Sequence, residues 1–333
     1  MGTFSEYLCN LLGYDKFLPS SSGVEACESA CKLARRWGYT VKGVEHDKAS
    51  IVMANGCFWG RSITASGGSD DPQRYTNFGP FTPGFPLVDF NDVGAIEDHF
   101  KRDPNCVAIM LEPIQGEAGV VIPEDGYLAR VKELCLKYNV LLIVDEVQTG
   151  LGRTGKLMAY MWDLGDDLKP DIVTLGKAIS GGVTPVSGIL ANDIVMNQIR
   201  PGDHGSTYGG NPLGMAIAKA AVQAIVEEGM VENSLALGAV LDARFKAFES
   251  PLIKEVRSRG LFCAMEFVQG EGVDGNDFAR LLLENGLITK ATHKDAVRFA
   301  PALVINEEEL NAAADIVEKT LVDFEKLRES RLV

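Results

Sequence analysis

Apolar residues in this chain recur with two spacings, one typical of helices and one typical of buried strands. Residues 24–38 place apolar side chains three or four positions apart, which predicts a helix that begins near Gly23. The segment before it, Pro19-Ser20-Ser21-Ser22, is rich in residues that cap helix N-termini. The start of this helix should therefore present free backbone N–H groups and the positive end of the helix dipole.

Short uninterrupted apolar runs predict buried strands, which are Ile51–Ala54, Val107–Leu111, Val140–Val144, Ile172–Leu175 and Val186–Leu190. A helix is predicted over Gly126–Tyr138, between two of these runs. Strand, helix and strand in this order predict an α/β fold with a mostly parallel central sheet flanked by helices. A ligand should then bind in the loops beyond the carboxyl ends of the strands.

The order of elements changes after residue 227, which predicts two domains. Residues 1–227 form the large domain, with a last helix over Leu213–Glu227, and residues 60–90 form a long loop rich in Gly, Ser, Pro and Asp. Residues 228–333 form a smaller C-terminal α+β domain. Its predicted helices are Val231–Phe248, Asp277–Asn285 and Glu307–Leu327, and its predicted strands are Leu261–Phe267 and Val297–Phe299.

Composition restricts the class of partner more than the chemistry. The chain has 333 residues, 46% of them hydrophobic, and a net charge of -14. Such an acidic surface disfavours nucleic acids and anionic membranes as partners. No apolar run approaches the roughly 18 residues that span a bilayer. The first residues resemble neither a signal peptide nor a transit peptide, which favours the cytoplasm.

The seven cysteines are scattered, and their odd number favours reduced thiols in an intracellular compartment. Cys27 and Cys31 lie four residues apart on the predicted helix that begins near Gly23. Two ligands do not make a metal site, so we interpret both as core residues and predict no metal.

Two polar sites follow predicted strands. Asp145 and Glu146 stand directly at the end of the Val140–Val144 run. Taken alone, they fit a strand end that reaches solvent, or a helix cap. Lys177 follows the run Ile172–Leu175 and precedes a turn of small residues. An amine there would be partly desolvated, which lowers its pKa and favours a nucleophile. Taken alone, Lys177 also fits an ordinary surface lysine.

Together, Lys177 and Asp145 fit an enzyme that uses pyridoxal 5'-phosphate (PLP). This cofactor needs a lysine to bind it covalently and an acidic group to keep its pyridine nitrogen protonated. It also needs a cradle for its phosphate, which the helix N-terminus at Gly23 and Val24 could supply.

Motifs along most of the chain carry a resemblance to a known family. They are Gly23-Val24-Glu25-Ala26, Phe58-Trp59-Gly60-Arg61, Gly79-Pro80-Phe81-Thr82-Pro83-Gly84-Phe85, Glu112-Pro113-Ile114-Gln115-Gly116-Glu117-Ala118-Gly119, Val144-Asp145-Glu146-Val147-Gln148-Thr149-Gly150, Leu175-Gly176-Lys177, Ser206-Thr207-Tyr208-Gly209-Gly210-Asn211-Pro212 and Arg298-Phe299-Ala300-Pro301. In this order they resemble the class III (fold type I) aminotransferases, and within them the ornithine branch. The resemblance implies a PLP-dependent transferase fold with a large PLP-binding domain.

The resemblance also implies roles for individual residues. Lys177 would bind the cofactor and then move a proton between substrate and cofactor, while Asp145 would pair with the pyridine nitrogen. The other implied cofactor-binding residues are Gly23 and Val24 on the phosphate, Phe58 and Val147 on the two ring faces, Gln148 on the phenolic oxygen, and Ser206 and Thr207 on the phosphate of a neighbouring subunit. The implied assembly is a homodimer.

Substrate binding is implied for two arginines and one glutamate. Arg61 and Arg298 would bind substrate carboxylates, and Glu117 would pair with Arg298 while ornithine is bound. Each arginine also fits an ordinary surface ion pair. Glu112 is expected to order the site rather than to react.

The implied reaction moves the terminal amino group of L-ornithine to 2-oxoglutarate, giving glutamate-5-semialdehyde and glutamate. It links ornithine and arginine metabolism to proline biosynthesis. The family has a longer segment before the Gly23 helix, so an inactive PLP-fold protein is one alternative and a mitochondrial protein without its targeting segment is another. Acetylornithine and 4-aminobutyrate aminotransferases are alternatives within the family.

Overall fold

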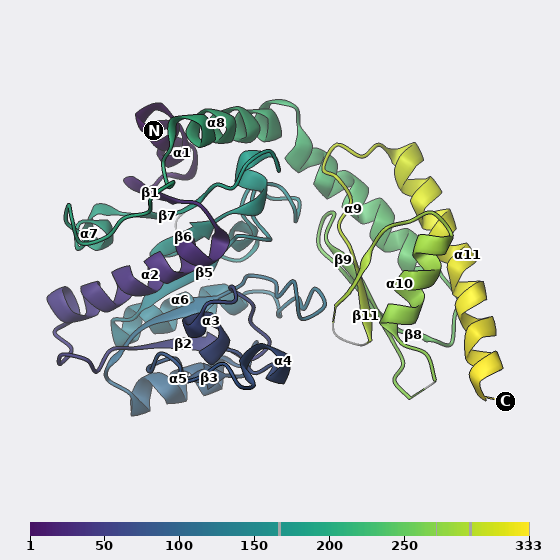
Figure 1. Ribbon diagram of the computed structural model, residues 1–333, viewed down its shortest axis with the longest axis horizontal. Coiled ribbons are helices and arrows are strands. Elements are labelled where there is room, and N and C mark those ends of the chain that lie inside the picture. The colour runs from purple at the N-terminus through teal and green to yellow at the C-terminus, as the bar shows by residue number, and fades with distance from the viewer. Residues whose placement is uncertain (166–167, 271, 293–294, 333) are drawn as a thin grey trace. The chain divides into compact units, whose positions relative to one another are not determined.

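A computed structural model describes residues 1–165, 168–270, 272–292 and 295–332. The chain divides into two compact units (Figure 1). Unit 1 comprises Met1–Pro113, Pro123–Leu151 and Met158–Val226. Unit 2 comprises Ile114–Ile122, Gly152–Leu157 and Glu227–Val333.

A single division after residue 227 misses the two internal segments of unit 2. Arg153 illustrates the reason, since it donates hydrogen bonds to the carbonyl oxygens of Leu261 and Pro301, at 2.9 and 2.6 Å. Contacts across more than a hundred residues leave no mark on local hydrophobic periodicity, so the pattern could not assign Gly152–Leu157 to the C-terminal unit.

Unit 1 is built on a 7-stranded sheet in the order β1-β7-β6-β5-β4-β2-β3 (Figure 1). Its strands are β1 (Lys16–Ser20), β2 (Ser50–Ala54), β3 (Leu87–Val88), β4 (Cys106–Leu111), β5 (Leu141–Asp145), β6 (Ile172–Leu175) and β7 (Ser187–Ala191). The pairs from β3 to β6 are parallel, whereas β7 runs antiparallel to β6 and β1 antiparallel to β7. Every residue of β2, β4, β5, β6 and β7 is buried, so both sheet faces are covered.

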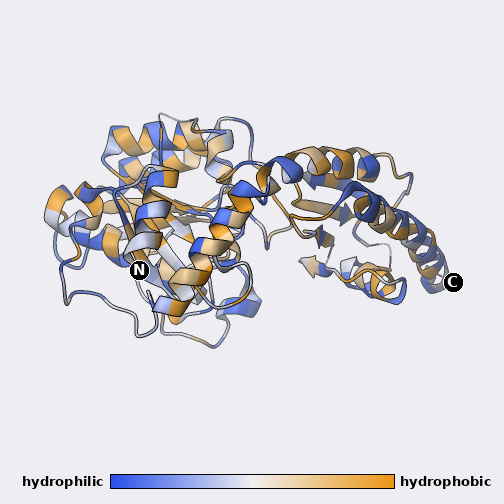
Figure 2. Cartoon of the chain, turned by 90° about the horizontal axis from the view of Figure 1, so that it is seen from above, coloured by the Kyte–Doolittle hydropathy of each residue, from blue (hydrophilic) through white to orange (hydrophobic). Residues whose placement is uncertain are grey.

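Helices of unit 1 provide that cover. They are α1 (Gly2–Leu12), α2 (Gly23–Trp37), α3 (Ile63–Gly67), α4 (Pro72–Tyr75), α5 (Val93–Arg102), α6 (Tyr127–Tyr138), α7 (Asp193–Met196) and α8 (Pro212–Glu227), with single turns at Gly38–Lys42, Ala159–Trp162 and Lys177–Ser180. The helix α2 packs along β7, β6 and β4 and buries one side of small and apolar residues. The helices carry both hydrophobic and hydrophilic residues along their length (Figure 2), as expected where one side is buried.

The predicted buried strands of the large domain are confirmed within one residue at each end. The prediction that residues 60–90 form a loop is wrong in part, because the segment contains α3, α4 and β3. These elements have five, four and two residues, too short to leave a periodic pattern. The strand β1 was missed because it contains Pro19, and its antiparallel pairing partner β7 lies more than a hundred residues away.

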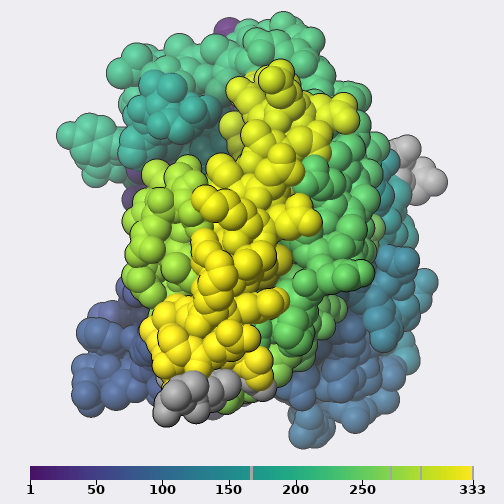
Figure 3. Space-filling view, turned by 90° about the vertical axis from the view of Figure 1, so that its right-hand side faces the viewer, coloured from purple at the N-terminus to yellow at the C-terminus, as the bar shows by residue number. Residues whose placement is uncertain are grey.

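Unit 2 contains a 4-stranded antiparallel sheet in the order β10-β11-β9-β8. Its strands are β8 (Ile253–Ser258), β9 (Cys263–Phe267), β10 (Lys290–Thr292) and β11 (Ala296–Phe299), and its helices are α9 (Met230–Lys246), α10 (Gly275–Glu284) and α11 (Glu307–Leu332). Figure 3 shows α11 on the surface with α9 and α10 on either side of it. Three rings, those of Phe267, Phe278 and Phe324, pack edge to face or tilted at 4.8–5.1 Å between β9, α10 and α11.

One buried carboxyl group of unit 1 has an unusual pKa. Glu146 follows β5 and is 1% exposed. Its Oε1 accepts from the N–H of Tyr160 at 2.7 Å and its Oε2 from the hydroxyl of Thr149 at 2.5 Å. Burial nevertheless raises the pKa of Glu146 to about 7, because desolvation of the charged form outweighs these hydrogen bonds.

This raised pKa makes stability depend on pH in a defined direction. The folded state holds the Glu146 proton more tightly than the unfolded state. The contribution of the protonated Glu146 carboxyl to the free energy of unfolding is therefore complete below pH 4.5, and it is lost as the pH rises through about 7. Across this window the free energy of unfolding should decline by on the order of 3 kcal/mol, and we expect Glu146→Gln to remove this decline. Urea denaturation at several pH values measures it. Glu133→Gln, at an exposed position of α6, is the control and should retain the decline.

Candidate functional site

Four parallel strands of unit 1, β2, β4, β5 and β6, bring their carboxyl ends to one edge of the sheet. A cavity of about 260 Å³ lies there. It is lined by residues that follow these strands and by the first turn of α2, which are Gly23, Val24, Cys27, Phe58, Trp59, Gly60, Glu112, Asp145, Val147, Gln148 and Lys177. The predicted residues Gly23, Val24, Phe58, Asp145, Val147, Gln148 and Lys177 thus share one cavity.

Asp145 is the buried acidic group of this cavity, with 5% of its surface exposed. Its Oδ1 accepts hydrogen bonds from the hydroxyl of Thr174 at 2.7 Å and from the backbone N–H of Val147 at 3.0 Å. Its Oδ2 accepts from the thiol of Cys27 at 3.3 Å. Three donors suit a carboxylate, which can only accept, and they offset the cost of burying its charge. The interpretation of Asp145 as a strand end that reaches solvent is therefore wrong.

Lys177 lies on the same cavity but is exposed. The residue as a whole is exposed, and partial desolvation of its amine stays a prediction. Its backbone has φ of 43°, in the left-handed region that residues other than glycine rarely adopt. Such strain persists where the surrounding structure holds it, and it occurs often at functional sites.

The first turn of α2 forms one side of the cavity. Ser22 caps the helix by accepting from the N–H of Glu25, and Glu25 in return accepts from the N–H groups of Ser21 and Ser22. This capping box leaves the N–H groups of Gly23 and Val24 available, since the first turn of a helix has no acceptors of its own. They point outward at the positive end of the helix dipole, as a phosphate requires.

Glycine is required at three positions around the cavity because the backbone there lies close to a valine side chain. A Cβ added at Gly23 would lie 2.9 Å from Cγ1 of Val147, and one added at Gly176 would lie 3.1 Å from the same atom. Gly60 has φ of +141°, and a Cβ there would lie 2.3 Å from Cγ2 of Val24. Side chains at these three positions would displace Val147 or Val24.

An aromatic residue, Phe58, and a carboxylate, Glu112, form another part of the cavity lining. The backbone N–H of Phe58 donates to Oε1 of Glu112 at 2.9 Å, so Glu112 orders the segment that carries the ring. The guanidinium carbon of Arg61 lies 5.9 Å from the centre of the Phe58 ring, and that of Arg74 lies at 4.8 Å. Arg61 is exposed, as a group that binds a soluble carboxylate should be.

Glu117 and Arg298, both in unit 2, form an ion pair. Oε1 of Glu117 lies 2.6 Å from Nη1 of Arg298, and Oε2 lies 3.2 Å from Nζ of Lys290. Lys290 and Arg298 are register partners on β10 and β11. Arg153 adds positive charge nearby, and burial together with Arg298 lowers its pKa to about 10. The pairing that the resemblance implied for Glu117 and Arg298 is therefore present in this chain.

Sequence reasoning missed one side chain of the cavity region and misjudged another. It overlooked the hydroxyl of Thr174, and it placed Cys27 in the core without a role, although both donate to Asp145. A polar residue in an otherwise apolar strand could have pointed to Thr174. Ser206 and Thr207 do not line this cavity, so their predicted role on a phosphate concerns another subunit and stays a prediction.

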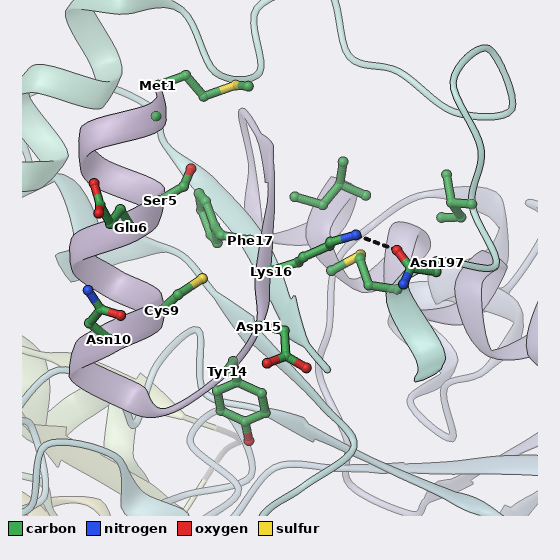
Figure 4. Close-up of a pocket in the computed structure, with 14 residues that line it drawn as sticks. Met1, Ser5, Glu6, Cys9, Asn10, Tyr14, Asp15, Lys16, Phe17 and Asn197 are labelled. Atoms are coloured by element: carbon green, nitrogen blue, oxygen red, sulfur yellow. Dashed lines mark hydrogen bonds between the residues drawn. The ribbon is translucent and has the colours of Figure 1, made fainter. Parts of the chain in front are cut away.

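Another hollow of unit 1, about 680 Å³, lies beside α1 and β1 (Figure 4). Lys16 points to Asn197 there and donates to its Oδ1, and it also pairs with Asp193 at 3.2 Å. Because its one lysine is already neutralised by a carboxylate, this hollow offers less chemistry than the cavity at the strand ends. Among the described residues, no group of three or more His, Cys, Asp or Glu side chains could hold a metal ion, and no helix could span a membrane.

Comparisons with known proteins agree on one family. The model of the family "Aminotransferase class-III" matches residues 1–321. The Caenorhabditis elegans protein named probable mitochondrial ornithine aminotransferase is 53% identical over 98% of this chain and 76% of its own length. The mitochondrial ornithine aminotransferase of Drosophila melanogaster is 50% identical over 97% of this chain and 74% of its own length.

A solved structure resembles the fold closely. It is an ornithine aminotransferase from Toxoplasma gondii, with partial occupancy of PLP at its active site. It is 44% identical to this chain and has a TM-score of 0.94. The match covers 98% of this chain and 77% of that one.

The close approach at Gly60 leads to a stability prediction. Gly60→Ala should lower the free energy of unfolding by about 2–5 kcal/mol, from left-handed backbone strain together with the collision with Val24. Gly43→Ala is the matched control, because Gly43 has φ of +80° but nothing within 4 Å of an added Cβ. It should lose only the strain, about 1–2 kcal/mol. Equal losses in urea denaturation would show that Val24 moves aside without cost.

Proposed function

Because the chain belongs to the class-III aminotransferase family, we propose that it is an ornithine δ-aminotransferase that uses PLP. It transfers the terminal amino group of L-ornithine to 2-oxoglutarate and gives glutamate-5-semialdehyde and glutamate. The observation that carries this proposal is the cavity at the strand ends, where Asp145 and Lys177 stand beside the first turn of α2. Identity of 53% and 50% to ornithine aminotransferases over nearly the whole chain supports the substrate.

The residues of the cavity fit this cofactor. The N–H groups of Gly23 and Val24 would hold the phosphate at the helix N-terminus. Asp145 would hold the proton of the ring nitrogen, and Phe58 and Val147 would cover the two ring faces. Gln148 would donate to the phenolic oxygen of the ring. When bound, PLP supplies a conjugated ring that takes up the electron pair left at the substrate carbon.

The protein's own part in the reaction is binding and proton transfer. Lys177 would anchor the cofactor through Nζ, and the freed amine would then remove a proton from the substrate carbon and return it at the cofactor side. Its strained backbone and its place in the cavity lining support this dual role, because the amine must reach both the cofactor and the substrate. The charge of Asp145 would keep the ring nitrogen protonated throughout.

Substrate selection would rest on arginines. Arg61 would bind one substrate carboxylate, and Arg298 would bind the α-carboxylate of glutamate or 2-oxoglutarate. The fork of a guanidinium can donate to both oxygens of a carboxylate. The ion pair of Arg298 with Glu117, 15% and 18% exposed, supports a group that is masked until a carboxylate competes for it.

A homodimer would complete the phosphate site through Ser206 and Thr207 of the neighbouring subunit. Thr207 is exposed, and the large apolar residues Tyr208 and Leu213 that follow it are 73% and 68% exposed. Exposed apolar side chains in and after this segment support an interface there.

The first test concerns the lysine. Lys177→Ala should lower kcat with ornithine by at least about a hundredfold, because it removes the group that moves the proton. It should also abolish the absorbance of covalently bound PLP, whereas Lys48→Ala, at an exposed position of unit 1, should change neither. Full activity of Lys177→Ala would refute its role. Turnover of acetylornithine or 4-aminobutyrate without turnover of ornithine would refute the substrate.

The second test concerns the arginine in unit 2. Arg298→Lys should raise KM for 2-oxoglutarate roughly 10- to 100-fold, since a lysine cannot donate two parallel hydrogen bonds to one carboxylate. KM for ornithine should change less than about twofold, because Arg298 is then paired with Glu117. Arg244→Lys, which alters an ion pair with Asp315 in the same unit, is the control. Equal changes in both KM values would contradict a selective role.

A further inference from the structure

The carboxylate of Asp145 is held by side chains from two different elements of unit 1. Thr174, on β6, donates to Oδ1 at 2.7 Å, and Cys27, on α2, donates to Oδ2 at 3.3 Å. The two donors also touch each other, with 3.8 Å between Sγ of Cys27 and Oγ1 of Thr174. Each oxygen of the carboxylate thus receives its own side-chain donor.

The fold brings these side chains together for separate reasons. Asp145 and Thr174 are register partners on the neighbouring parallel strands β5 and β6, so their side chains lie on the same face of the sheet. Cys27 reaches that face because α2 packs across the sheet, with Cys27 on its buried side. This arrangement is separate from the backbone N–H of Val147, which also binds Oδ1.

Both donors lie in the interior of the protein rather than on its surface. Cys27 is 1% exposed and Thr174 is 0% exposed. Burial, together with the charge of Asp145, raises the pKa of the Cys27 thiol well above its usual value. The thiol therefore keeps its proton at neutral pH and acts as a hydrogen-bond donor rather than as a nucleophile.

Core packing alone does not explain this placement. Cys31 lies one turn further along α2, is 3% exposed, and fills the same core without a hydrogen bond to Asp145. Cys27 differs from it by lining the cavity and by donating to the buried carboxylate. A buried charge that loses a donor loses stabilisation of its ionised form, so both donors affect what Asp145 can do.

We propose that Cys27 and Thr174 are positioning residues that hold the Asp145 carboxylate in the orientation needed to meet the ring nitrogen of the cofactor. This inference rests on the proposed function, since it requires that PLP bind in the cavity. Oδ1 carries two donors, so Oδ2, with its single weak thiol donor, is the oxygen with capacity left for the ring N–H. Thr174 holds the orientation of the carboxylate through Oδ1, and Cys27 donates to Oδ2, the oxygen that would accept from the ring N–H.

The substitutions below change only one thiol or one hydroxyl and leave every carboxyl and amino group near Asp145 in place.

The test measures the affinity of the full chain for PLP, by protein fluorescence at one fixed pH. Thr174→Val keeps the shape but removes the hydroxyl, and it should weaken PLP binding about tenfold, as expected for a hydrogen bond to a charged group. Cys27→Ala removes the weaker thiol donor and should cost about two- to threefold.

Matched variants separate positioning from packing. Thr174→Ser keeps the hydroxyl and should restore wild-type affinity within about twofold, while Cys31→Ala, which keeps both donors to Asp145, should bind PLP like the wild type. A loss in Cys27→Ala that equals that of Cys31→Ala would overturn the role of Cys27. Failure of Thr174→Ser to restore affinity would overturn that of Thr174. Failure of the wild-type chain to bind PLP would instead remove the proposed function itself.

Discussion

A buried carboxylate at the end of β5 is the constraint on which the site depends. Asp145 is 5% exposed, and an ionised group cannot stay there without donors. The backbone of Val147, the hydroxyl of Thr174 and the thiol of Cys27 meet this need from a loop, a strand and a helix. The packing of α2 on the sheet and the register of β5 with β6 are therefore linked to the chemistry of one side chain.

The second constraint is the close approach of the backbone to the Val147 side chain at the same cavity. The first turn of α2 must reach the cavity to offer its N–H groups, which brings Gly23 against Val147. Gly176 meets the same valine from the end of β6, directly before Lys177. Glycine at both positions lets helix N-terminus, carboxylate and lysine surround one cavity of about 260 Å³.

In unit 2, cationic side chains surround a carboxylate. Arg298 and Lys290 both contact Glu117, and the half-buried Arg153 donates to backbone carbonyl oxygens. Two cations, Arg298 and Lys290, thus share the single carboxylate of Glu117. Arg298 can exchange this carboxylate for another at little cost in free energy, which suits an enzyme that must accept amino donors and acceptors of different charge.

The sequence by itself determined the five central strands of the large sheet, the helix at Gly23 and the positions of Asp145 and Lys177, because these depend on local periodicity and on motifs that lie within a few residues. It could not reveal that residues 114–122 and 152–157 belong to unit 2, nor that Lys177 is exposed in the single chain. Cys27 shows the difference most clearly. Its helical spacing marks it as buried, but only the packing of α2 on β5 and β6 places its thiol 3.3 Å from Asp145. Burial follows from periodicity along one element, whereas a hydrogen-bond partner depends on how distant elements pack.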